Sequence, residues 1–396
     1  MNNPFIDRKQ NFFQLACIQV IPLGITAMSI GDMIAKKHGA GVAIGSIIVA
    51  NLILWLIAIL IITMAFRFRS NAVENVNNYL GKFSSWCMRF LLMISFLFWY
   101  TFQIRATLPI LEIYLNKSSL LYLGTSLALF SAILSMGGIR LIKWSTVISF
   151  PFVLGYILYG ILQTGPTFSE IGYLGISASA VLASVLSFFP FTANTTTFFR
   201  HSRSRADSYL ALTLTTVINI LFQASTIWIK FTQTENYFFT LVTLFFIMWI
   251  LICVNLLSFI YLVSASWEGW IRQLNGAKGY LFIGIIGTLA HILLPDSAPF
   301  LLIQNLANCY LASQAAILCI GFLIHFLIED RPHYKGKNIN SFCWLMGCIV
   351  ATILTIHNSA DTTTPLFAGI WTSIASFFGV LFIKENVWAA KTFLKL

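Results

Sequence analysis

Long apolar stretches, separated by short polar or basic segments, set the pattern of this chain. About twelve of them approach the roughly 20 residues that an α-helix needs to cross a bilayer. They fall at 12–35, 42–66, 86–108, 120–136, 145–162, 178–199, 209–229, 238–264, 280–294, 300–328, 339–356 and 366–383. Hydrophobic residues make up 58% of the chain and charged residues 9%, whereas an ordinary soluble domain carries about 25% charged residues. The pattern therefore predicts an all-α polytopic membrane protein.

One span differs from the others because its apolar run is interrupted. The stretch SVLSFFPFTANTTTFFRHSRSRAD begins at Ser184 and places Pro190 inside the span 178–199, followed by Asn194 and four threonines. Proline removes a backbone donor and clashes with the preceding turn. At membrane depth, a freed backbone group is tolerated only inside protein or beside a wet cavity. We expect a broken helix here. The alternative is a kinked helix whose hydroxyls bond to its own carbonyls.

The first span repeats this feature. Its sequence VIPLGITAMSIGD contains Pro22, Gly24, Ser29, Gly31 and Asp32. Two interrupted helices at corresponding places in two halves point to an inverted-repeat transporter. We therefore predict one transmembrane domain over 1–396, with broken helices 1 and 6. Its first repeat is 1–165 (helices 1–5), its second 166–329 (helices 6–10), and two accessory helices, 11 and 12, occupy 330–396.

The basic residues predict how the chain is oriented. The formal charge is +11, and most Lys and Arg fall in alternate loops, on the side that would also hold both termini. Because short cytoplasmic loops are enriched in Lys and Arg, both termini are predicted to be cytoplasmic in a cell membrane, inner or plasma. The pair Lys36–Lys37 is an exception to this distribution. Basic loops beside apolar spans indicate a lipid bilayer as partner rather than nucleic acid.

Several functional classes lack a motif. The seven cysteines form no CxxC pair and mostly lie inside apolar runs, which is typical of packing residues. His291 and His325 have no carboxylate or cysteine at ligand spacing, so a metal site is not predicted. The sequence contains no phosphate-binding loop and no hydrolase signature. We predict neither an enzyme nor a cofactor, and no obligate protein partner.

The span 86–108 contains FWYTFQIR, in which Trp99 and Gln103 lie four residues apart and share one helical face. An indole beside a carboxamide suits a flat heteroaromatic solute, because one group stacks and the other hydrogen-bonds. The alternative is an aromatic-rich core helix whose Gln103 bridges to a neighbour. Arg105, near the outer end, is expected to snorkel or to pair, for instance with Glu112.

The span 238–264 carries one polar stripe, formed by Asn255, Ser258 and Tyr261. Neutral oxygens on such a stripe can complete a sodium shell with carbonyls from an unwound helix 1. The alternative is hydrogen bonding between helices. Proton coupling generally needs an ionisable group inside the membrane, and the best placed acid, Asp32, lies near a helix end. Na⁺ is therefore the predicted coupling ion, with H⁺ left open.

Two segments resemble nucleobase–cation symporter family 1. FTANTTTFFRHSRSRADSYLA resembles the end of that family's helix 6, and GGIRLIKWSTVISFPFVLGYIL resembles its entry into helix 5, with Pro151 as the interrupting proline. FWYTFQ, the polar stripe of helix 8 and INSFCWLMGCIV are similar to further segments of the family. The chain departs from the family where Thr195 follows Asn194 and where Arg200 follows the two phenylalanines.

The resemblance implies a site and an activity. Trp99 would stack on the solute, Gln103, Ser187 and Asn194 would hydrogen-bond to it, and Phe188 would close the other face. Ser29 completes the predicted solute site, and the cation would bind Asn255, Ser258 and the carbonyls of Gly24 and Ile25. The implied function is cation-coupled symport of a nucleobase-like solute (cytosine, a purine or a hydantoin) by alternating access. The alternatives are an amino-acid permease of the same fold and a non-transporting membrane receptor or assembly protein.

Overall fold

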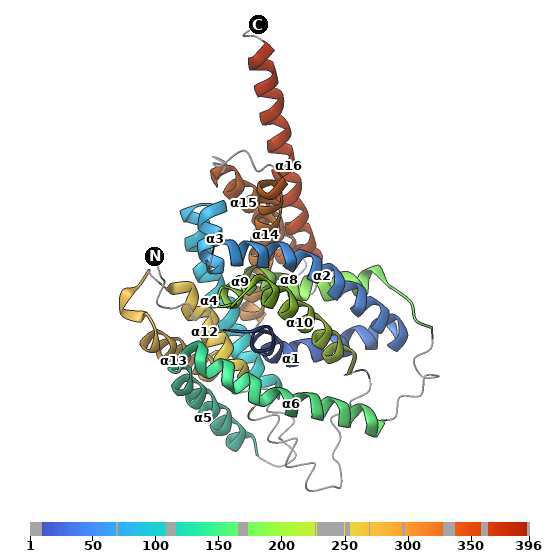
Figure 1. Cartoon of the computed structure of the whole chain (residues 1–396), viewed down its shortest axis with the longest axis vertical. Coiled ribbons are helices and arrows are strands. Elements are labelled where there is room, and N and C mark those ends of the chain that lie inside the picture. Colours follow the sequence, from blue (N-terminus) through green and yellow to red (C-terminus); the bar gives the residue numbers. More distant parts are fainter. Residues whose placement is uncertain are drawn as a thin grey trace. The chain divides into compact units, whose positions relative to one another are not determined.

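The computed structural model describes residues 10–68, 70–107, 116–164, 173–225, 227, 249, 254–268, 270–294, 298–327, 337–357 and 363–393 (Figure 1). These residues form helices, and they contain no β-strand beyond an isolated bridge between Gln10 and Ser202. The helices are α1 Phe12–His38, α2 Ala40–Phe68, α3 Ala72–Tyr79, α4 Lys82–Thr107, α5 Lys117–Ser135, α6 Gly138–Thr164, α8 Ala178–Thr192, the 3₁₀ turn η2 Ala193–Thr195, α9 Thr196–Phe199, α10 Arg205–Ser225, α12 Asn255–Trp267, the 3₁₀ turn η4 Arg272–Leu274, α13 Ala277–Leu293, α14 Ala298–Leu327, α15 Lys337–His357 and α16 Thr363–Phe393.

The prediction of an all-α membrane protein is confirmed. Within the described residues, seven helices are long and apolar enough to cross a bilayer. The predicted spans fall on described helices, although the span 238–264 is described as helix only from Asn255 onward. The total of twelve spans stays a prediction.

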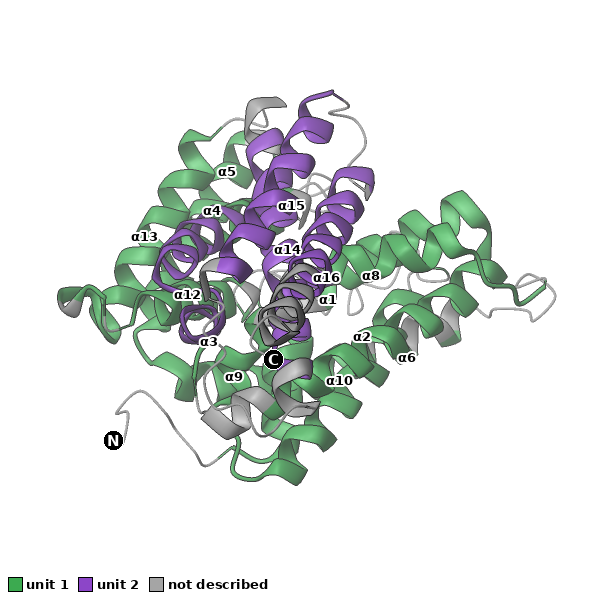
Figure 2. Ribbon diagram, turned by 90° about the horizontal axis from the view of Figure 1, so that it is seen from above, with its two compact units in different colours: residues 1–71, 96–188, 194–295 green, residues 72–95, 189–193, 296–396 purple. Residues whose placement is uncertain are grey.

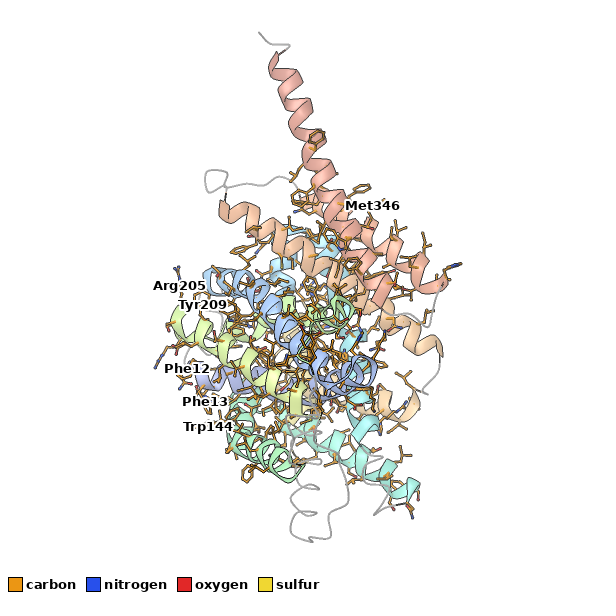
Figure 3. All side chains as sticks on the ribbon, turned by 90° about the vertical axis from the view of Figure 1, so that its right-hand side faces the viewer. Phe12, Phe13, Trp144, Arg205, Tyr209 and Met346 are labelled. Carbon is orange, nitrogen blue, oxygen red and sulfur yellow. The ribbon has the colours of Figure 1, made fainter. Side chains whose placement is uncertain are left out.

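Large apolar side chains stand exposed on these helices, as expected for a surface that meets lipid rather than water. Figure 3 labels Phe12, Trp144 and Tyr209 among them; Trp144 keeps 53% of its surface exposed and Phe12 40%. A water-soluble protein rarely leaves so many large apolar groups uncovered.

The chain divides into two compact units, coloured separately in Figure 2. Unit 1 contains residues 1–71, 96–188 and 194–295, and unit 2 contains residues 72–95, 189–193 and 296–396. The units are defined by packing, so the predicted division into two inverted repeats and an accessory pair stays a prediction. All residues of the predicted site belong to unit 1.

Within unit 1, one group of helices packs around α1. The backbone N–H of Phe12 donates to Asp207 at 3.1 Å, and Gly24 faces the ring of Phe222, so α1 and α10 run in the same direction side by side. α2 joins them through the bond from Asn219 Nδ2 to Asn51 Oδ1, 2.7 Å long. α8 joins them through Ser184 and Gln223.

A second group within unit 1 consists of α5, α12 and α13, with the C-terminal part of α4. A Cβ atom at Gly284 of α13 would lie 2.4 Å from Cβ of Ala132 in α5. Only glycine permits this close approach of two helices. Tyr100 of α4 adds a hydrogen bond of 3.2 Å to the carbonyl of Ala128 in α5.

Unit 2 contains α3, the start of α4, α14, α15 and α16. α3 is an eight-residue helix that hydropathy does not predict, because it is short and only one face is apolar. Two α15 side chains bind the backbone at the C-terminal end of α3. Asn340 donates to the carbonyl of Tyr79 at 2.8 Å, and the Ser341 hydroxyl donates to the carbonyl of Leu80. The two C-terminal helices thus pack on the rest of unit 2 rather than standing apart.

The prediction of a broken first helix is wrong. α1 is one continuous helix from Phe12 to His38, through Gly24 and Gly31. Gly24 is buried, and a Cβ added there would lie 3.8 Å from the Phe222 ring. This glycine therefore serves helix packing rather than unwinding.

The longer first helix also accounts for the exceptional lysine pair. Lys36 and Lys37 lie in the last turn of α1, where cations interact favourably with the helix dipole. Lys36 is also paired with Asp32 one turn earlier, at 2.6 Å.

Candidate functional site

At the second predicted break the helix changes its type but is not interrupted at Pro190. The helix that begins at Ala178 runs past Pro190 to Thr192, changes to the 3₁₀ turn η2, and resumes as the single turn α9. Asn194 occupies the middle of η2 and is 3% exposed. Its Oδ1 accepts a bond of 3.3 Å from the Thr197 hydroxyl. Its Nδ2 has no hydrogen-bond partner within the described residues, so the amide keeps one buried donor for a ligand.

Two residues of the predicted site, Ser187 and Phe188, lie on α8 shortly before the 3₁₀ turn. Phe188 is 5% exposed and Ser187 is half-buried. The Ser187 hydroxyl donates to the carbonyl of Ala183 at 2.7 Å, so its proton is already used within the helix. Ser187 can therefore accept a hydrogen bond from a solute more readily than it can donate one.

On α4, Trp99 and Gln103 share one face, as the spacing predicts. The Trp99 ring is half-buried and stands edge-on to two phenyl rings, with centroids 5.4 Å from Phe102 and 6.0 Å from Phe98. These neighbours fix the plane of the indole. Gln103 is completely buried. A carboxamide in this position needs polar partners, from the protein or from a ligand.

On α12, Ser258 is completely buried, and its hydroxyl donates to the carbonyl of Val254 at 3.2 Å. Its lone pairs remain available to a cation. The ring of the next residue, Phe259, lies 5.7 Å from that of Phe96 on α4, which brings these two helices together.

The remaining predicted residues are Gly24, Ile25, Ser29 and Asn255. α1 packs against α12, which places Gly24 and Ser258 on adjacent helices, but the carbonyls of a continuous α1 are engaged in its own helical bonds. Ser29 is exposed. The side chains of Ile25 and Asn255 lie outside the described part of the structure. Assembly of Trp99, Asn194 and Ser258 into one pocket stays a prediction.

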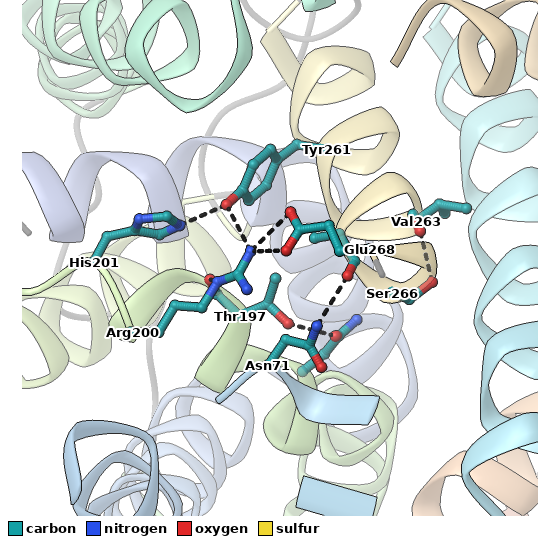
Figure 4. Close-up of polar contacts among 10 residues, drawn as sticks. Asn71, Thr197, Arg200, His201, Tyr261, Val263, Ser266 and Glu268 are labelled. Atoms are coloured by element: carbon teal, nitrogen blue, oxygen red, sulfur yellow. Dashed lines mark hydrogen bonds and ion pairs between the residues drawn. The ribbon is translucent and has the colours of Figure 1, made fainter. Parts of the chain in front are cut away.

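A buried ionic cluster that the sequence pattern does not predict lies at the end of this helix (Figure 4). Arg200 has no exposed surface, and its Nη2 lies 3.0 and 2.9 Å from the two carboxylate oxygens of Glu268. Tyr261 accepts from the same Nη2 at 3.4 Å, and its hydroxyl lies 2.5 Å from Nε2 of His201. The basic sequence around Arg200 and His201 gives no sign that these two residues are buried. Tyr261 was predicted only as part of the helix 8 stripe.

Arg105 is also placed differently from its expectation. Its guanidinium donates to the carbonyls of His291, at 2.8 Å, and of Leu294. These carbonyls end α13, where a cation is favourable. Glu112, the partner suggested from sequence, lies outside the described residues.

No protein-family model matches the sequence, and no curated protein matches it significantly. Its fold, in contrast, is that of membrane transporters, and none of the similar structures named below is an enzyme. One is Mhp1, a nucleobase-cation-symport-1 family transporter, in a closed conformation with bromovinylhydantoin bound. It has a TM-score of 0.61 and 15% identity, and the match covers 99% of this chain and 96% of that one.

A Na⁺-coupled sialic acid symporter gives a TM-score of 0.64 at 14% identity, over 94% of this chain and 90% of that one. A manganese transporter of Eremococcus coleocola gives a TM-score of 0.54 at 11% identity, over 95% of this chain and 93% of that one. At these identities the likeness establishes the fold alone. This structural likeness supports, at the level of the fold, the sequence resemblance to nucleobase–cation symporter family 1.

Proposed function

We propose that this protein is a secondary transporter related to nucleobase–cation symporter family 1, and that it carries a small, flat, nitrogenous solute such as cytosine, a purine or a hydantoin. The single observation that carries this proposal is Asn194. It sits at the break of a membrane helix, buried, with a donor that has no partner within the described residues. Such a group is costly unless a ligand satisfies it.

The α4 side chains fit the same solute. An indole with its plane fixed by Phe98 and Phe102 offers a stacking surface for a heteroaromatic ring. A buried carboxamide at Gln103 has both a donor and an acceptor, which matches the mixed edge of a nucleobase or hydantoin. The similar structure Mhp1 has a hydantoin bound, which supports this solute class.

We further propose that the coupling ion is Na⁺, held in part by Ser258. The buried Ser258 oxygen is neutral and keeps its lone pairs, and hard cations take oxygen ligands. Two acids that could serve proton coupling are already paired. Asp32 pairs with Lys36 near a helix end and is 45% exposed, and Glu268 pairs with Arg200. H⁺ coupling is the alternative.

The proposed orientation places both termini in the cytoplasm of an inner or plasma membrane. The basic residues that follow the broken helix, Arg203 and Arg205, would then face the cytoplasm. The end of α9 at Phe199 would be the cytoplasmic end of the broken helix.

A rival function has one observation in its favour. The similarity to a sialic acid symporter is as strong as that to Mhp1, and a solute with a carboxylate, such as an amino acid, would also use a broken helix. A receptor or assembly protein of this fold would bind a solute without accumulating it.

A binding screen separates these functions. The purified protein is tested by thermal shift, in NaCl and in choline chloride, against cytosine, hypoxanthine, hydantoin, several amino acids and sialic acid. We expect stabilisation by at least one of the first three, and loss of it in Trp99→Leu. Trp86→Leu is the matched control, because Trp86 lies on the same helix beside Phe90 but is 47% exposed. Stabilisation by carboxylate solutes alone would contradict the proposal.

A further inference from the structure

The ion pair between Arg200 and Glu268 is an unusual feature for a membrane helix to keep. Both charged groups are buried, and removing a charge pair from water gains little net stability. Glu268 follows directly on α12, at its C-terminus, where a negative charge is disfavoured by the helix dipole. The fold therefore retains an interaction that stability alone does not explain.

The pair joins two helix groups of unit 1. Arg200 follows α9, which packs on α1 and α2, whereas Glu268 follows α12, which packs on α5 and α13 and also contacts α1. The rings of Phe198 and Tyr261 stack at the same junction, with centroids 5.5 Å apart. Asn71 donates a hydrogen bond of 3.0 Å to the carbonyl of Ala265 (Figure 4).

The pair is also connected to the proposed solute site. Nε of Arg200 donates to the carbonyl of Thr197 at 3.2 Å, and the Thr197 hydroxyl donates to Oδ1 of Asn194. A movement of Arg200 away from Glu268 would shift the turn that orients the Asn194 amide. The solute-binding donor and the ion pair therefore belong to one hydrogen-bonded chain.

We propose that the Arg200–Glu268 ion pair, supported by Tyr261 and His201, is a gate that closes the cytoplasmic side of the transport pathway and separates when that side opens. This inference rests on the proposed function, since alternating access requires helix groups to rock against each other around the solute site. Arg200 and Glu268 act as positioning residues, and neither needs to touch the solute.

Accessibility of a buried cysteine tests the gate. In a protein freed of its native cysteines, Ser266→Cys places a thiol on the last turn of α12, where the serine is 4% exposed. The protein is reconstituted, and labelling by a membrane-impermeant maleimide is timed from the cytoplasmic side. Glu268→Gln should raise the labelling rate at least tenfold. Asp32→Asn, which breaks the exposed pair with Lys36, should leave it unchanged.

Exchange of the two charges provides the specificity test. Arg200→Glu with Glu268→Arg should return labelling to the slow rate of the parent. A folded Glu268→Gln protein that labels as slowly as the parent would overturn the gate, as would an increase that the charge exchange does not reverse. If Glu268→Gln does not fold, Tyr261→Phe replaces it, with a smaller increase expected and an unchanged rate again overturning the gate. The assay needs no solute, so its failure is distinguishable from failure of the proposed transport.

Discussion

Removal of the Ser258 hydroxyl is the sharpest test of the proposed cation site. The side chain is completely buried, and its hydroxyl donates to the carbonyl of Val254, one turn earlier at the start of α12. That carbonyl keeps its place in the helical ladder when the hydroxyl is lost, so we expect Ser258→Ala to cost little stability. A cation would instead lose one oxygen ligand.

The expected magnitude follows from this difference. A buried hydrogen bond to a charged group contributes roughly 1.5–3 kcal/mol, and the cation can recover part of the loss from water, which leaves about 1–2 kcal/mol. At about 1.4 kcal/mol per factor of ten, the apparent Kd for Na⁺ should rise about 5- to 30-fold. The assay is a Na⁺ titration of solute binding to the purified protein, with a solute found in the binding screen.

Ser266→Ala is the matched control. Ser266 lies on the same helix, is also buried, and donates to the carbonyl of Val263 at 2.6 Å. It should leave the Na⁺ titration unchanged. Equal effects of the two substitutions, or no effect of Ser258→Ala, would refute the assignment of Ser258 as a cation ligand.

Two further predictions concern Asp32 and Gly284. Because Asp32 is partly exposed and paired with Lys36, Asp32→Asn should change uptake less than twofold. If uptake by the parent protein does not depend on Na⁺ and Asp32→Asn abolishes it, proton coupling is favoured instead. Gly284→Ala forces a Cβ atom to within 2.4 Å of Ala132 and should destabilise the protein by about 1–3 kcal/mol, measured as a lower melting temperature. Gly155→Ala, which meets nothing within 4 Å, should not, and a similar melting temperature for both variants would contradict the packing argument.

The sequence predicted the helices well because their signal is local. A run of apolar residues long enough to cross a bilayer needs no partner to be recognised. The same reasoning predicted an interruption at Pro190, but the α-helix continues to Thr192 and then changes to the 3₁₀ turn that contains Asn194. α3 was missed because it has only eight residues and one apolar face, which is too short for a membrane-spanning apolar run.

Glycine was the weak point of the prediction. Gly24 in α1 is compatible both with an unwound helix and with close packing, and only the position of Phe222 decides between them. That ring belongs to α10, far away in the chain. The Asp32–Lys36 pair, in contrast, has i,i+4 spacing and could have been recognised from sequence.

The ionic cluster could not be read from the basic run that contains Arg200. Arg203 and Arg205 look the same in sequence, yet Arg200 alone of the three is buried, paired with an acid 68 residues away. A useful signal was the single acidic residue at the end of an apolar helix, Glu268. Such a charge needs a partner, and a buried arginine is the best available one.

Uptake into proteoliposomes tests the central claim most directly. Reconstituted protein is given an inward Na⁺ gradient and the radiolabelled form of the nucleobase or hydantoin that binds best. We predict accumulation above the external concentration, abolished when the Na⁺ gradient is dissipated and strongly reduced in Asn194→Ala. Absence of accumulation of any such solute, with normal accumulation of an amino acid or sialic acid, would contradict the account.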